Sequence, residues 1–125
     1  MNDKLSEKVI GAAFQVHNTL GFGFLESVYE KALAVELRKI GIENRFQQPI
    51  QVFYDGEVVG DFVADIVIGD SLIVELKSVS KLSEKHEVQL VNYLAATNTE
   101  TGLLINFGPD KVEVKRKYRT YKPKS

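Results

Sequence analysis

The spacing of the apolar residues changes after residue 41, and this change constrains the fold more than any other feature of the sequence. Apolar side chains recur every three or four residues over 5–20 and again over 25–40, as on one face of a helix. Gly21-Phe22-Gly23 separates the two stripes, and Gly41 follows the second one, where helices commonly end. The sequence therefore predicts two amphipathic helices before the rest of the fold begins.

Three strand-like segments follow the two helices. Residues 49–54 and 57–68 are predicted strands, and Asp55-Gly56 between them is typical of a tight hairpin turn. A second turn at Gly69-Asp70 leads into a strand over 72–77. Because tight turns join these strands, we expect them to be antiparallel neighbours in one sheet.

The last third of the chain predicts one more helix and two more strands. Ser83 suits the N-cap of a helix that reaches about Thr97. Residues 101–107 are almost all apolar, which favours a strand buried on both faces, and 112–116 is a short candidate edge strand. We expect one α/β domain over 1–125, with a central mixed sheet flanked by helices.

Composition excludes several classes of protein. The chain has 125 residues, which suits a single domain, and 44% hydrophobic with 26% charged residues is typical of a soluble globular protein. The absence of cysteine excludes disulfides, thiolate nucleophiles and cysteine-ligated zinc. No apolar run approaches the roughly 20 residues of a membrane span, and the first residues lack the apolar stretch of a signal peptide. We therefore expect a cytoplasmic protein that does not enter membranes.

The net charge of −1 hides a basic C-terminal segment. From about residue 111 the chain carries seven basic residues and a single acid, Glu113, so the remainder is acidic. A basic tail of this kind could contact a polyanion such as nucleic acid. A solvated extension explains the same charges, and the sequence leaves both interpretations open.

Charged residues interrupt two strands that otherwise look buried. Asp65 lies within the apolar run 62–68, where an unpaired carboxylate would be costly. Glu75 and Lys77 interrupt the next strand, and because strand side chains alternate they share a face, roughly 6–7 Å apart. If the two strands pair, Asp65 joins Glu75 and Lys77 on that face.

This constellation suits a divalent cation. Mg²⁺ prefers oxygen ligands, usually one or two carboxylates completed by water and a substrate phosphate. Lys77 could orient an attacking water or neutralise charge on a scissile phosphate. The alternative is an ordinary Glu75–Lys77 ion pair with Asp65 capping a turn. A Glu-x-Lys pattern alone favours that alternative, whereas Asp65 one hairpin earlier favours the metal.

Three further residues are candidates for the same site. Gln89 and Tyr93 are polar-tipped, four residues apart on the third helix, and could support the metal cleft or touch a phosphate. Taken alone, Gln89 is better explained as a surface residue, and Tyr93 as a packed residue whose hydroxyl reaches solvent. Glu26 lies near the start of the second helix, where the helix dipole favours a carboxylate, and could also be a third acid of the site.

The arrangement of these residues resembles the PD-(D/E)XK nuclease superfamily, whose core runs helix, three-strand meander, helix, strand. Asp65 matches the strand aspartate of its motif, and Glu75-Leu76-Lys77 matches (D/E)-x-K. Gln89-Leu90-Val91-Asn92-Tyr93 matches the Q-x-x-x-Y helix motif of the RecB-like branch. More closely, the chain resembles the small GxxExxY proteins, and the residues that carry that name are Gly23, Glu26 and Tyr29.

The resemblance implies a restriction-endonuclease-like fold and a nuclease that uses Mg²⁺ or Mn²⁺ to hydrolyse phosphodiester bonds, in DNA rather than RNA. Asp65 and Glu75 would bind the metal, with Glu26 assisting directly or through water. Lys77 would act on the nucleophile or the transition state, and Gln89 and Tyr93 would position the lysine or the phosphate.

Two alternatives belong to other classes of function, because members of a fold family can lose catalysis and keep the scaffold. One is a catalytically silent module that binds nucleic acid or a metal. The other is an interaction protein that uses the former catalytic cleft of the scaffold to assemble with other proteins. A homo-oligomer is a further expectation.

Overall fold

The predicted order of helices and strands is confirmed by the structure, a computed structural model that describes residues 3–119. None of the helices within those residues is long and apolar enough to cross a membrane. The elements, in chain order, are α1 (Asp3–Leu20), α2 (Glu26–Lys39), β1 (Arg45–Tyr54), β2 (Glu57–Ile68), β3 (Leu72–Lys77), α3 (Glu84–Thr97), β4 (Thr101–Phe107) and β5 (Val112–Tyr118).

The five strands form one mixed sheet in the order β1-β2-β3-β4-β5, which confirms the predicted α/β class. The pairs β1–β2, β2–β3 and β4–β5 are antiparallel, whereas β3 and β4 are parallel and α3 connects them. Strand β1 begins at Arg45, earlier than the predicted start at Pro49. Pro49 is tolerated inside the strand because β1 is an edge strand, where a missing N–H need not break a ladder.

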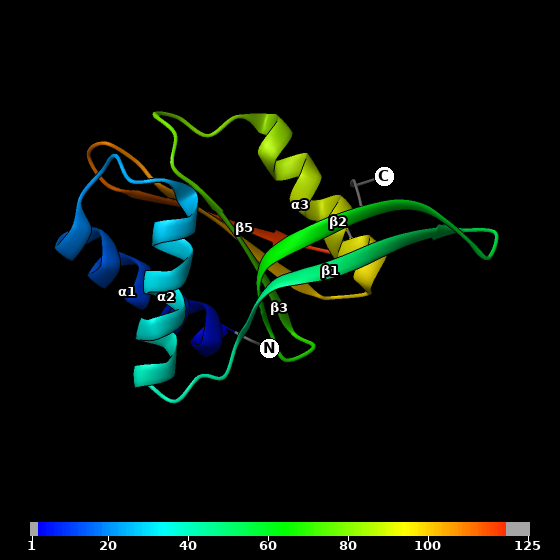
Figure 1. Cartoon of the computed structure of the whole chain (residues 1–125), viewed down its shortest axis with the longest axis horizontal. Helices are drawn as coiled ribbons and strands as arrows, with labels where there is room; N and C mark the ends of the chain where they lie inside the picture. Colours follow the sequence, from blue (N-terminus) through cyan, green and yellow to red (C-terminus); the bar gives the residue numbers. More distant parts are fainter. Residues whose placement is uncertain (1–2, 120–125) are drawn as a thin grey trace.

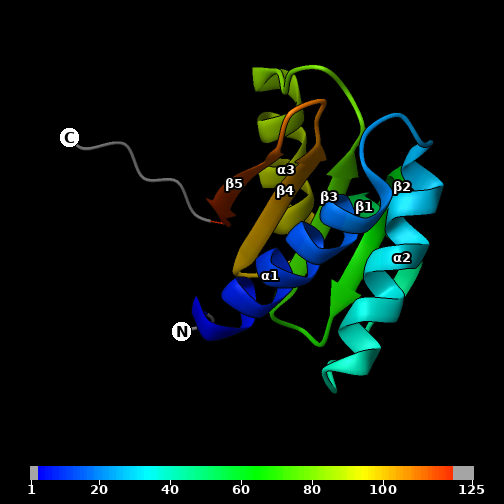
Figure 2. The same ribbon diagram turned by 90° about the vertical axis from the view of Figure 1, so that its left-hand side faces the viewer.

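Helices cover both faces of the sheet. Helices α1 and α2 lie on one face and α3 lies on the other (Figures 1 and 2). Alternating residues of the central strands divide between two cores: Val74 and Leu103 pack with α1 and α2, whereas Ile73 and Leu104 pack with α3. Helix α3 approaches β4 so closely that a Cβ on Gly102 would meet a Leu90 side-chain carbon at 2.9 Å.

The β1–β2 hairpin extends beyond the rest of the sheet as an arm (Figure 1). Strand β2 pairs with β3 only from Ile66 to Ile68, so the remainder of the hairpin is a two-stranded ribbon. Its turn at Asp55-Gly56 has φ angles of 54° and 84°, which are typical of tight hairpin turns and confirm the predicted turn. Phe53 and Tyr54 near the tip are 61% and 74% exposed, so the arm presents apolar surface to solvent.

The first part of the basic segment is strand β5 at the edge of the sheet. Lys117 forms an ion pair with Glu87 of α3 at 2.5 Å. The guanidinium of Arg119 donates to Glu100, also at 2.5 Å. The basic residues after 119 lie outside the described residues. Residues 112–118 of the basic segment are therefore a strand of the folded sheet.

Candidate metal centre

The turn between α1 and α2 is held by Tyr29. The Tyr29 hydroxyl donates to the Gly21 carbonyl and accepts the Phe24 N–H at 3.3 Å. The Tyr29 ring stacks on Phe107 of β4, with ring centroids 4.4 Å apart, which anchors α2 to the sheet. Glu26, the first residue of α2, is thereby placed at a fixed position relative to the strands.

The end of β3 lies against the same turn. The buried Asn106 amide accepts the Val79 N–H at 2.9 Å and donates to the Val79 carbonyl at 2.8 Å. Ser78 donates its hydroxyl to the Phe24 carbonyl at 2.9 Å. These contacts bring the α1–α2 turn beside the strand end that carries Lys77.

Strands β2 and β3 stop pairing at the point where the two acids stand. The last recorded backbone pair is Ile66 with Val74. Beyond it, Asp65 Oδ2 accepts the Leu76 N–H at 2.7 Å, and Glu75 Oε2 accepts the Asp65 N–H at 3.1 Å. The two carboxylates therefore take the place of backbone acceptors, which fixes both side chains at the junction of the strands.

The charges at this junction repel each other. Glu75 is only 8% exposed, and burial, with the Asp65 charge second, raises its pKa to about 8. Burial and the Glu26 charge also raise the pKa of Asp65, against the opposing effect of the Leu76 N–H. The Lys77 ammonium lowers the pKa of both carboxyl groups. The site would therefore gain from an additional positive charge.

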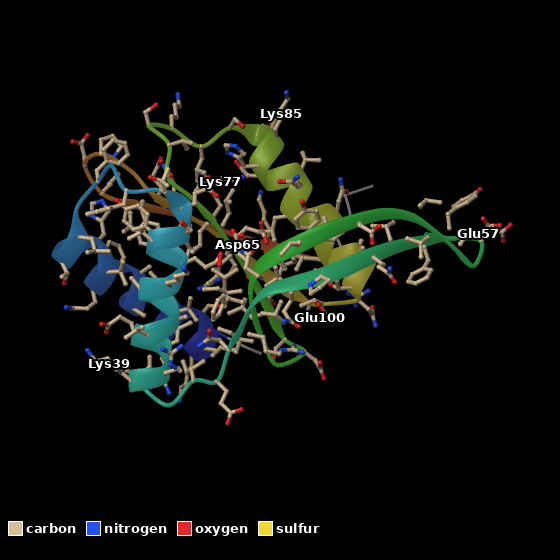
Figure 3. All side chains as sticks on the ribbon, viewed as in Figure 1. Lys39, Glu57, Asp65, Lys77, Lys85 and Glu100 are labelled. Carbon is tan, nitrogen blue, oxygen red and sulfur yellow. The ribbon has the colours of Figure 1, made fainter. Side chains whose placement is uncertain are left out.

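Lys77 and Tyr93 approach the acids from two elements. Figure 3 shows Asp65 and Lys77 between α2 and α3 in that view. Burial raises the pKa of Tyr93, and the charges of Glu75 and Asp65 raise it further, so the phenol is close to both acids. The Tyr93 ring stacks on Phe62 of β2, with centroids 3.6 Å apart.

Gln89 is exposed and contacts Tyr93. A hydrogen bond from Gln89 lowers the pKa of Tyr93, so the two residues of the helix pattern are in contact. Phe62 was not singled out in the sequence, because an aromatic residue in a strand looks like ordinary core.

Two further polar residues near the site were also missed by the sequence analysis. Glu30 of α2 is 5% exposed, and Gln47 of β1 donates its amide N–H to both oxygens of that carboxylate, at 2.6 and 2.9 Å. Glu30 lies on the buried stripe of α2, three and seven residues before Leu33 and Leu37. A charged residue on an otherwise apolar helix face is the feature of the sequence that could have identified Glu30.

Glu26 is close to the acids but does not join them in a compact cluster. Its charge raises the pKa of both Asp65 and Glu75, which places it in their neighbourhood. Within residues 3–119, however, no three His, Cys, Asp or Glu side chains are grouped tightly enough to hold a metal ion. The part of Glu26 in a metal site stays a prediction.

The residues present nevertheless fit a hard divalent cation. Each carboxylate uses one oxygen for a backbone N–H, which leaves Asp65 Oδ1 and Glu75 Oε1 for another partner. One or two carboxylates are the usual protein contribution to a Mg²⁺ site, with water and phosphate as the other ligands. A metal here would be held by Asp65 and Glu75, with Lys77 beside it.

Comparison with known proteins gives a family and a fold. A family model described as the PD-(D/E)XK nuclease superfamily matches residues 3–117. No curated protein sequence matches the chain significantly. Among solved structures, the crystal structure of SSO0001 is 20% identical, with a TM-score of 0.61. The match covers 97% of this chain but 60% of that protein, and at this identity it shows similarity of fold.

Proposed function

The chain belongs to the PD-(D/E)XK nuclease superfamily, and we propose that it is a nuclease that uses Mg²⁺ or Mn²⁺ to hydrolyse phosphodiester bonds. The observation that carries this proposal is the pair of acids at the β2–β3 junction, buried Glu75 and half-buried Asp65, with Lys77 on the same strand as Glu75. Within the superfamily we place the chain among the GxxExxY proteins of the RecB-like branch. Gly23, Glu26 and Tyr29 support that placement, since Tyr29 holds the turn that precedes Glu26 at the start of α2.

Asp65 and Glu75 would hold the metal through the oxygens that accept no backbone N–H, and Glu26 would assist directly or through water. When bound, the metal would activate a water and stabilise charge that develops on the phosphate. The pKa of about 8 means that Glu75 holds a proton at neutral pH without a cation. Metal binding would therefore release a proton from the site.

Lys77 would supply a positive charge to the attacking water or to the scissile phosphate. Two supports for this role are strand alternation, by which Lys77 shares a face with Glu75, and the effect of the lysine charge, which lowers the pKa of both carboxyl groups. Tyr93, held by Gln89 and by the Phe62 ring, would position the phosphate or the lysine.

Divalent metal should stabilise the native protein. In a chelator-treated sample, millimolar Mg²⁺ or Mn²⁺ should raise the melting temperature, because a ligand that binds only the native state stabilises it by mass action. The gain is about 2.7 kcal/mol at 100 times Kd. The Asp65→Asn/Glu75→Gln double variant is the control and should show no shift, measured by calorimetry at constant ionic strength. An equal shift in the double variant would place the metal elsewhere.

We propose that DNA is the substrate and that β5 contacts its phosphates. Replacing Lys115 and Lys117 by Ala should weaken duplex binding in fluorescence anisotropy, with a salt slope lower by about 0.9 for each lost phosphate contact. Lys39→Ala, at the far end of α2, is the control for lost charge. A matched RNA duplex should bind more weakly. An unchanged salt slope would make the basic segment a solvated edge of the sheet.

The alternative is a binding module on the same scaffold that has lost catalysis. The observation that favours it is the lack of a three-ligand cluster within residues 3–119. Wild-type protein that binds metal and DNA but cleaves nothing would establish that alternative. We also propose a cytoplasmic location, which the cysteine-free composition supports, and a homo-oligomer, which the exposed apolar residues of the β1–β2 arm support.

A further inference from the structure

We propose that Glu30 is a positioning residue that holds the Gln47 side chain away from Asp65, so that the Asp65 carboxylate stays free for a cation. This inference deepens the proposed function and rests on it. It concerns a contact between α2 and β1 that lies outside the motif residues.

The first observation is a local irregularity in β1. Gln47 has a φ of 55°, in the left-handed region that a residue with a side chain seldom adopts. The pairs on either side of it, Phe46 with Ile66 and Gln48 with Ala64, keep one register. That register places Gln47 directly opposite Asp65, and no pair is recorded between them. The backbone is therefore distorted at the position that faces the candidate ligand.

The register shows what the distortion avoids. Opposite residues of an antiparallel pair carry their side chains on the same face, with Cβ atoms about 4.5–5.5 Å apart. In ordinary extended backbone, the Gln47 amide would thus stand beside the Asp65 carboxylate. An amide N–H there could donate to the Asp65 oxygen that accepts no backbone N–H, and would compete with a cation.

Glu30 supplies the alternative partner. Its two oxygens lie 2.6 and 2.9 Å from Gln47 Nε2, and Glu30 as a whole residue is 5% exposed. Burial raises the pKa of Glu30 and the Gln47 hydrogen bond lowers it, so the amide stabilises the ionised form. A strained backbone held by a buried charged acceptor is the arrangement expected at a functional position.

The test uses three variants and Mn²⁺ alone, measured by titration calorimetry on the full chain. Glu30→Leu frees the Gln47 amide and should weaken Mn²⁺ binding about 10–100-fold, the usual effect of losing an outer-shell partner. Glu30→Gln keeps an oxygen acceptor for Gln47 and should remain near wild type. In Glu30→Leu/Gln47→Gly the competing amide is gone and glycine accepts the left-handed backbone, so affinity should recover.

A role of Glu30 in packing alone would give a different result, because the double variant would then bind as weakly as Glu30→Leu. That outcome overturns the inference. Glu36→Leu, on the same helix, is the control for a general effect of losing an acid from α2. Melting temperatures establish that each variant is folded.

A second measurement separates this inference from the proposed function. In chelator, nuclear Overhauser contacts of the Gln47 side-chain amide should connect it to Glu30 in the wild type and to Asp65 in Glu30→Leu. If they do and the wild type binds no Mn²⁺, the metal centre fails while the placement of Gln47 holds. If the amide stays beside α2 in Glu30→Leu, the inference is wrong whatever the metal does.

Discussion

Replacing Lys77 by Met should lower the cleavage rate about 10²–10³-fold while Mn²⁺ still binds, the usual effect of removing one group that stabilises a transition state. Both acids remain in this variant, so the metal ligands are unchanged. Asp65→Asn should lose metal binding and cleavage together, because it removes a ligand charge. Single-turnover cleavage and titration calorimetry measure the two properties separately.

The assay needs single- and double-stranded DNA and RNA, each with Mg²⁺ and with Mn²⁺. Lys39→Met is the matched control, because its ammonium is exposed at the end of α2 and pairs only with Glu36 among the described residues. Cleavage that survives both substitutions would indicate a contaminant or another active site. Lost metal binding in Lys77→Met would contradict the role given to the lysine.

Glu75→Gln should remove a large part of the pH dependence of stability in metal-free protein. The pKa of Glu75 is raised from 4.5 to about 8 in the native state, so the native protein binds the proton more tightly than the unfolded chain. The stabilising contribution of the protonated group is therefore complete below pH 4.5 and is lost as the pH rises through 8. Between these values the unfolding free energy should fall by up to about 1.4 kcal/mol per pH unit.

Urea unfolding in chelator at several pH values measures this effect. The variant carries no titrating group at position 75, so its stability should change less with pH than that of the wild type. Glu7→Gln, on the exposed face of α1, should leave the wild-type curve unchanged. Parallel curves for wild type and Glu75→Gln would mean that Glu75 is ionised in the native protein throughout this range.

The elements with a strong apolar period were predictable from the sequence. Both N-terminal helices and β4 follow from patterns that burial alone imposes. The start of β1 was not predictable, because Arg45, Gln47 and Gln48 are polar and this segment becomes a strand only by pairing with β2. The role of Lys117 and Arg119 in ion pairs likewise depends on where α3 and the next loop lie.

The candidate metal centre was predictable where polar residues interrupt apolar strands. Asp65 and Glu75 stood out for that reason, and the strand pairing then brought them together. Glu30 and Gln47 are 17 positions apart, on a helix and a strand. Neither residue lies in a local sequence pattern that identifies the other as its partner. Tyr93 was predicted, but its stacking on Phe62 depends on the tertiary structure.

The anomalous scattering of Mn²⁺ in a crystal of the wild-type protein, soaked at neutral or slightly alkaline pH, tests directly whether Asp65 and Glu75 hold a metal. We predict one strong peak at the β2–β3 junction, about 2.1 Å from one oxygen each of Asp65 and Glu75. The Lys77 ammonium should face the same side of the metal. A peak elsewhere, or no peak while both carboxylates keep only their backbone partners, would contradict the assignment of a metal centre to these residues.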